Sequence, residues 1–136
     1  IHRDAHAGNM VMAEDGPIGF LHFEISVLGI RLYDICYFLT SQWIGNYTSD
    51  EGIQSWLNLV NTFKQGYEEI CSLSLGERTS VFYVMCAIQM IFIAYWQDQK
   101  KHDLVKTNLD ALLALLQTRE KIDLAFDVGK LETKNI

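Results

Sequence analysis

Apolar residues recur at intervals of three and four over most of the chain after residue 30, which is the pattern of helices with one buried face. A first helix is predicted over residues 31–44, because Leu32, Ile35, Cys36 and Leu39 follow this spacing. A breaker, Gly29, precedes it, and residues 45–46, Gly-Asn, are the kind of pair that ends a helix. This segment therefore predicts an amphipathic helix with a buried side.

A second helix is predicted to run up to Cys71, with Ser49 or Asp50 at its N-cap. Its apolar residues form one stripe, which is expected to lie in the core. The stripe consists of Ile53, Trp56, Leu57, Val60, Phe63, Tyr67 and Ile70.

Residues 77–99 predict a third helix that is apolar on nearly every side. Its longest apolar run, residues 81–96, contains Gln89 and is shorter than the roughly 20 residues of a membrane span. The sequence therefore predicts a helix buried all round at the centre of a bundle, and no membrane association. A last helix is predicted over residues 103–128, followed by a polar, frayed tail at 129–136.

The first 30 residues have a different pattern. A short apolar stretch, Met10 to Met12, is followed by a turn at residues 13–17 and by an apolar strand at residues 18–24. This predicts a β-hairpin. The predicted fold class is thus mainly α with a small β-hairpin, with about four helices behind it.

The charge and the cysteine content indicate which classes of binding partner and which cellular compartment to expect. The net charge is −6 and the basic residues are scattered, which argues against nucleic-acid binding. An acidic surface is compatible with a small cationic substrate. The three cysteines, Cys36, Cys71 and Cys86, show no paired spacing, so free thiols in a reducing, cytoplasmic compartment are expected.

The candidate chemistry lies in the run HRDAHAGN at residues 2–9, which holds Asp4 and Asn9 at a fixed separation. Phosphoryl transfer needs a carboxylate that orients the attacking hydroxyl and oxygen ligands that hold magnesium against the phosphates. Asp4 can supply the first, and Asn9 can supply part of the second.

Three ordered motifs carry a resemblance: HRDAHAGN, then GFLHFE ending at Glu24, then GIRLYDICYFL containing Asp34. Together they are similar to the aminoglycoside phosphotransferase and choline kinase-like family, which shares the catalytic loop of protein kinases. The resemblance implies the C-terminal helical lobe of a protein kinase-like fold over residues 1–136. It also implies Mg²⁺ and ATP as cofactors, ATP being the phosphate donor, and a small-molecule hydroxyl substrate such as an aminoglycoside or amino alcohol.

By this resemblance Asp4 is the catalytic base and Asn9 a ligand of magnesium and nucleotide. His22 stands where the family has a metal-binding aspartate, and Glu24 is expected to share that position from the same face of the strand. Imidazole suits zinc and other transition metals better than magnesium, so His22 is a departure from the family pattern.

Four other residues have expected roles near the loop. His2 and Asp34 are expected to support it structurally, Asp34 through hydrogen bonds. Arg3 and His6 are weaker candidates as neighbours of the phosphate or substrate, because both are better explained as loop-packing or solvent-facing residues.

In the family, a nucleotide-binding lobe precedes the catalytic loop, whereas here the loop starts at residue 2. The chain is therefore expected to lack that lobe and to need it as a partner. The predicted function is an ATP-dependent phosphotransferase acting on a hydroxyl. The alternative is a catalytically impaired relative that binds a ligand or a partner, which His22 favours.

Overall fold

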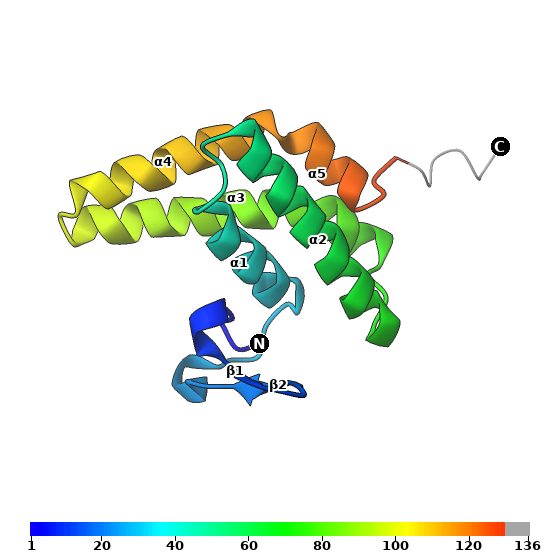
Figure 1. Cartoon of the computed structure of the whole chain (residues 1–136). Helices are drawn as coiled ribbons and strands as arrows, with labels where there is room; N and C mark the ends of the chain where they lie inside the picture. Colours follow the sequence, from blue (N-terminus) through cyan, green and yellow to red (C-terminus); the bar gives the residue numbers. More distant parts are fainter. Residues whose placement is uncertain (130–136) are drawn as a thin grey trace.

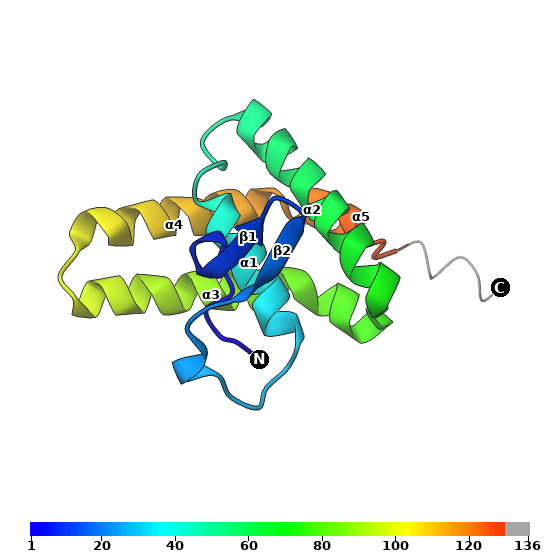
Figure 2. The same ribbon diagram turned by 60° about the horizontal axis from the view of Figure 1, so that its bottom comes forward.

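The computed structural model describes residues 1–129 and contains a loop, a hairpin and five α-helices (Figure 1). Helices α3 and α4 lie side by side and antiparallel, and α1 and α2 pack on the same body. The N-terminal loop and the hairpin lie at one end of α1 (Figures 1 and 2). The predicted fold class of helices with a small β-hairpin is confirmed.

The hairpin pairs strands β1 (Met10–Ala13) and β2 (Gly16–Phe20) in antiparallel fashion. Gly16 has a φ of 120°, a conformation that favours glycine at this turn. The predicted strand to residue 24 is wrong, because β2 ends at Phe20 and a 3₁₀ helix, η2, covers Phe23–Ile25. The chain before Met10 is also a 3₁₀ helix, η1 (Ala7–Asn9), so β2 has no strand to pair with beyond the bond from Leu21 N to Asn9 O.

Helix α1 spans Leu32–Trp43, close to the predicted range. One side of it is fully buried, including Cys36, Leu39 and Trp43. The indole nitrogen of Trp43 donates to the carbonyl of Ala111 in α4, at 2.9 Å. Helix α1 is therefore the central element that connects the loop region to the rest of the core.

Helix α2 spans Asp50–Ile70, and Ser49 caps it by accepting a hydrogen bond from the backbone of Gly52. Trp56, Leu57 and Val60 are buried as the apolar stripe predicts. Ile70 is 90% exposed, so its predicted place in the core is wrong. It is the last residue of the helix, and the next residue, Cys71, is extended.

Helix α3 spans Leu75–Asp98 and starts two residues earlier than predicted, because Ser74 and Glu77 form a reciprocal capping box. The predicted burial on all sides is wrong. Tyr83, Met90, Ile91 and Tyr95 are each more than half exposed, while the buried residues lie toward α1 and α4. By length and composition alone, α3 is apolar enough to cross a membrane, but the core helices of soluble proteins can meet the same criteria. In the structure, 28% of its most apolar 18-residue stretch is buried.

The predicted last helix is divided into α4 (His102–Gln117) and α5 (Arg119–Ala125). The break lies at Thr118, whose hydroxyl donates to the carbonyl of Ala114 at 2.8 Å. Such bonds from threonine to the preceding turn bend helices. The bend lets Ile122 and Phe126 reach the core, where they are 0% and 1% exposed. The predicted frayed tail, apart from Gly129, lies outside the described residues.

Candidate active site

The catalytic loop is fastened to the first turn of α1 by one carboxylate. Asp34 accepts hydrogen bonds from the backbone nitrogens of His2, at 2.6 Å, and Arg3, at 2.8 Å. Arg3 has a φ of 72°, a left-handed conformation that non-glycine residues rarely adopt. The two bonds to Asp34 hold the backbone in this conformation, so the helix start determines where the loop lies.

His2 lies behind the loop and is 7% exposed. Its Nδ1 accepts from the backbone of Asp4, at 3.2 Å, so its Nε2 carries the proton and donates to the carbonyl of Leu21, at 2.6 Å. The ring also packs against Phe20 and Phe23. His2 thus connects the loop to the end of the hairpin.

The carboxylate of Asp4 receives two hydrogen bonds from different elements. Tyr37 of α1 donates its hydroxyl at 2.8 Å, and the Asn9 amide nitrogen donates at 2.7 Å. The Asn9 nitrogen also donates to the Asp4 carbonyl, at 2.9 Å. The carboxylate is therefore fixed in position while 31% of its side chain remains exposed.

Opposing effects act on the pKa of Asp4. Partial burial raises it, but the hydrogen bonds from Tyr37 and Asn9 and the nearby rings of His6 and His2 lower it, and the net pKa is below the ordinary value. The same contact works in the other direction on Tyr37, whose phenol pKa is raised by burial and by the Asp4 charge. Asp4 is thus ionised at neutral pH and ready to accept a hydrogen bond from a hydroxyl.

His6 stands at the start of η1, where its Nδ1 accepts from the backbone of Gly8 at 3.0 Å. Its Nε2 therefore carries the proton and lies 3.6 Å from a carboxylate oxygen of Asp4, too far for a direct hydrogen bond. Arg3 is exposed at the edge of the loop. Of these two weaker candidates, the structure brings only His6 next to Asp4.

His22 and Glu24 do not lie on one face of a strand, which corrects the sequence expectation. His22 has left-handed backbone angles just after the hairpin, and Glu24 is inside η2. Their side chains are 63% and 77% exposed, with 3.9 Å between His22 Nδ1 and Glu24 Oε1. In the part of the chain that the structure describes, no third His, Cys, Asp or Glu joins this pair as a possible metal ligand.

The residues fit magnesium only in part. The two bonds that the Asn9 amide is seen to make both use its nitrogen, so its oxygen is the atom that can bind a metal, and Glu24 offers a carboxylate. Imidazole is not a preferred magnesium ligand. Within residues 1–129, no group of three or more His, Cys, Asp or Glu side chains could hold a metal ion.

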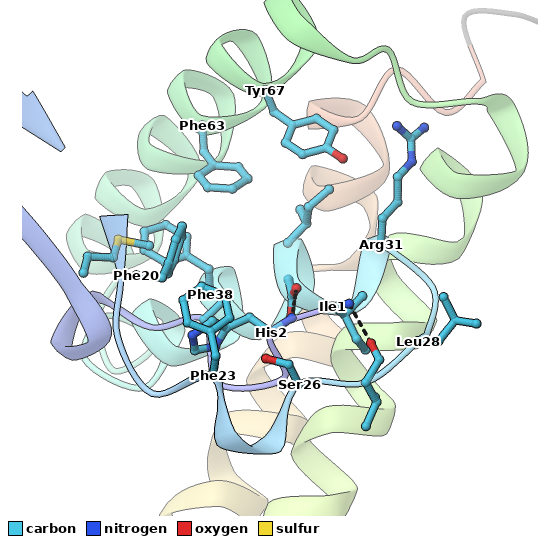
Figure 3. A pocket seen from close by; sticks show the side chains of 15 residues that line it. Ile1, His2, Phe20, Phe23, Ser26, Leu28, Arg31, Phe38, Phe63 and Tyr67 are labelled. Atoms are coloured by element: carbon cyan, nitrogen blue, oxygen red, sulfur yellow. Dashed lines mark hydrogen bonds between the residues drawn. The ribbon is translucent and has the colours of Figure 1, made fainter. Parts of the chain in front are cut away.

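Two cavities flank the loop. The larger, about 830 Å³, lies behind it, where Phe63 and Tyr67 of α2 face His2 and Phe23 (Figure 3). Neither Asp4 nor Asn9 lines it. The smaller, about 240 Å³, lies between α1, α3 and α4, and His6 and Tyr37, which both contact Asp4, are part of its wall.

Sequence reasoning missed Tyr37, which orients Asp4. Its position was detectable, because it follows Asp34 by three residues on the predicted helix and so lies on the same face. It also missed Thr40 and Gln89 in the smaller cavity. Gln89 was noticed only as a polar interruption of an apolar run, and nothing in the sequence showed which elements would surround it.

A loop that holds an ionised, hydrogen-bonded carboxylate beside a cavity is the arrangement expected of an enzyme that transfers a group to a hydroxyl. The family model described as "Phosphotransferase enzyme family" matches residues 1–71, just over half of the chain. The chain belongs to this family, and the resemblance to aminoglycoside and choline kinase-like phosphotransferases agrees with it. No curated protein and no solved structure matches the chain.

Proposed function

We propose that this chain is the lobe of an ATP-dependent phosphotransferase that carries the catalytic loop and accepts the hydroxyl of a small molecule. The observation that supports this most is the Asp4 carboxylate, held between Tyr37 and Asn9 at 2.8 and 2.7 Å. The C-terminal lobe of a kinase-like fold is the architecture that the family suggests for it. A lobe that holds the nucleotide completes such an enzyme, and the cytoplasm is its proposed location.

In the proposed reaction, the acceptor hydroxyl donates a hydrogen bond to an oxygen of Asp4. The hydroxyl oxygen forms the new bond to the γ-phosphorus of ATP as the bond from that phosphorus to the β–γ bridging oxygen breaks and ADP leaves, and the hydroxyl proton passes to the Asp4 carboxylate. A carboxylate with a lowered pKa is a weak base, so its larger contribution is to orient the hydroxyl. Orientation is sufficient for phosphoryl transfer, because its transition state is loose and the nucleophile does not need to be deprotonated early.

Phosphotransferases of this kind generally use ATP and a divalent metal, which would neutralise charge on the transferred phosphate. Three residues are proposed to contribute to binding the metal and the nucleotide. Asn9 would do so through its amide oxygen, and His22 and Glu24 would together replace the metal-binding aspartate of the family. His22 is the weakest member of that set, since its side chain is largely exposed and its carboxylate neighbour is 3.9 Å away.

Replacing the carboxylate tests the proposed role of Asp4. Asp4→Asn keeps the shape and removes the charge, and we expect kcat for ATP-dependent phosphorylation by the full-length protein to fall about 10²- to 10⁴-fold. Asp15→Asn, on the exposed hairpin turn, is the matched control and should leave kcat unchanged. An active protein in which Asp4→Asn turns over normally would show that another group serves as the base.

The second candidate function is a catalytically impaired relative that binds a ligand or partner, which the partial magnesium fit favours. Calorimetry of magnesium-nucleotide binding to the full-length protein separates the two. Binding by the natural protein supports the enzyme. If only His22→Asp binds, the natural protein has lost its metal position and the binding module is the better description.

A further inference from the structure

The smaller cavity contains polar atoms that have no partner. It is walled by α1, α3, α4 and His6 of the loop. Gln89 of α3 is 0% exposed, and neither its amide nitrogen nor its amide oxygen has a hydrogen-bond partner within residues 1–129. Thr40 of α1 is 1% exposed, and its hydroxyl also has none in the part of the chain that the structure describes.

Such groups are unusual in a folded core. Buried polar groups are nearly always hydrogen-bonded, because leaving one unpaired in a low-dielectric interior is unfavourable. Gln89 offers a donor and an acceptor, and Thr40 offers a hydroxyl that can do either. An occupant of the cavity that carries its own donors and acceptors would satisfy all three atoms.

The cavity wall contains no Asp, Glu, Lys or Arg. The rest of the lining includes the aromatic side chains of Tyr37, Phe92 and Trp96, together with aliphatic, hydroxyl and amide side chains. A cationic group held beside Gln89 would lose its water and meet no carboxylate in the wall, because Asp4 lies outside the lining, beyond Tyr37 and His6. An uncharged molecule with several hydroxyls and an apolar face would meet both amide and aromatic partners. This differs from the cationic substrate with which the acidic composition is compatible.

The position of the cavity relates it to Asp4. His6 and Tyr37 line it, and Tyr37 donates to the Asp4 carboxylate while His6 lies 3.6 Å from it. A molecule in the cavity would thus extend toward the carboxylate that orients the acceptor. The volume, about 240 Å³, is below the roughly 300–1,000 Å³ typical of sites for drug-sized ligands, so the occupant is small.

We propose that the cavity between α1, α3 and α4 binds the phosphate acceptor, and that this acceptor is an uncharged polyol or sugar held by Gln89 and Thr40. The proposal rests on the proposed function, since it names the substrate class of the same site. It assigns Gln89 and Thr40 to substrate binding and leaves the proton at Asp4.

Calorimetry with paired probes tests it on the full-length protein. Glucose and myo-inositol are the neutral probes, and glucosamine is the cationic counterpart of glucose. The natural protein is expected to bind at least one neutral probe and to bind glucosamine at least about tenfold more weakly than glucose. A preference for glucosamine, or no binding of any neutral probe at about 10 mM, overturns the proposal.

Gln89→Leu removes both unpaired amide atoms at similar size and should fold at least as well, which a thermal melt checks. It is expected to weaken neutral-probe binding at least about tenfold. Gln97→Leu, exposed near the end of the same helix, is the matched control and should bind as the natural protein does. Unchanged binding by Gln89→Leu would mean that only water occupies the polar end of the cavity, which overturns the proposal.

Two further variants test the hydroxyl contact and the charge argument. Thr40→Val should also weaken neutral binding, whereas Gln89→Glu adds a carboxylate and should shift preference toward glucosamine. Binding with no phosphorylation would support the cavity and contradict the phosphotransferase. Phosphorylation of amino compounds in preference to neutral ones would support the phosphotransferase and contradict the cavity assignment.

Discussion

In the helical body, residues 31–129, the side chains of Leu39, Trp43, Val60 and Met85 are completely buried. In the loop segment, residues 1–30, the buried residues among those whose burial the structure describes (1–16 and 19–30) are His2, Ala5 and Asn9, while every residue from 19 to 30 is exposed. The helical body is stabilised by apolar burial, which is non-directional. The loop segment depends on a few directed hydrogen bonds, above all those to Asp34.

The difference shows how a precise site is attached to a tolerant scaffold. A packed core accepts many apolar substitutions of similar volume. A hydrogen bond between the Asp34 carboxylate and a particular backbone nitrogen has no such substitute. We therefore expect core changes to act on the whole fold and loop changes to act on the site alone.

The largest expected effect is on the helical body. Trp43→Ala removes a fully buried indole that donates to Ala111 and packs edge-on against Trp56, and it should lower the free energy of unfolding by about 3–5 kcal/mol. Urea denaturation measures this. Leu124→Ala, at a residue that is 64% exposed, is the control and should change it by less than about 0.5 kcal/mol. If both variants lost the same free energy of unfolding, the distinction between core and surface positions would be wrong.

The next effect is confined to the loop segment. Asp34→Ala leaves the backbone nitrogens of His2 and Arg3 without their acceptor, a loss of about 1–3 kcal/mol in local stability. Hydrogen exchange should show these two amides losing protection while α3 keeps its own. Asp34→Asn retains one acceptor oxygen and should lose less. If α3 opened together with the loop, the two regions would form one cooperative unit.

A smaller effect is expected at the carboxylate itself. Tyr37→Phe removes the hydroxyl that donates to Asp4, so the pKa of Asp4 should rise and stability should fall by about 1 kcal/mol. An NMR titration of the Asp4 carboxyl measures the pKa. Tyr33→Phe is the control, because the Tyr33 ring lies tilted beside that of Tyr37, and its hydroxyl makes no hydrogen bond to Asp4 within residues 1–129. A pKa that stays low in Tyr37→Phe would assign the shift to Asn9 and the neighbouring histidines.

The smallest effect concerns the ion pair that joins the start of α1 to the start of α3. Arg31 donates to Glu77 at 2.6 Å, and this bond and those within the Ser74 cap lower the pKa of Glu77 to about 2. Because the pKa of Glu77 is lowered on folding, its ionised carboxylate stabilises the fold at pH values above 4.5, the ordinary pKa of this group. That stabilisation is lost as the pH falls from 4.5 toward 2.

Glu77→Gln keeps a side chain that can cap the helix and removes the charge. Because the pair is at the surface, the difference in unfolding free energy from the natural protein should be at most about 1 kcal/mol at pH 7. Denaturation at several pH values should show that difference shrinking between pH 4.5 and 2. A difference that is constant with pH would mean that the charge of Glu77 contributes nothing.

Local signals in the sequence predicted most of the helices. The cap at Ser49 and the spacing of Leu32, Ile35 and Leu39 locate α2 and α1 within one or two residues. The bend at Thr118 was missed, because a threonine inside a periodic pattern does not reveal whether its hydroxyl will bond to the turn before it. The exposed side of α3 was missed because composition does not show how many neighbours a helix will have.

The candidate site was predicted as far as its motif extends. Asp4 and Asn9 lie within five residues of each other, so their proximity is a local property. The contacts of Tyr37 and the cavity around Gln89 depend on packing between α1, α3 and α4. The early end of β2 likewise depends on what its partner strand does, so the placement of His22 and Glu24 required the structure.

The attachment of the loop to Asp34 also has a consequence for the order of folding. Its two hydrogen bonds connect Asp34 with Arg3 and His2, which precede it in the sequence by 31 and 32 positions. By contrast, α3 and α4 are consecutive helices joined by a turn at residues 99–101. Closing a longer segment carries a larger entropic penalty. The catalytic loop should thus be among the last parts of residues 1–129 to reach its native arrangement, and pulse-labelled hydrogen exchange during refolding should protect α3 before His2 and Arg3.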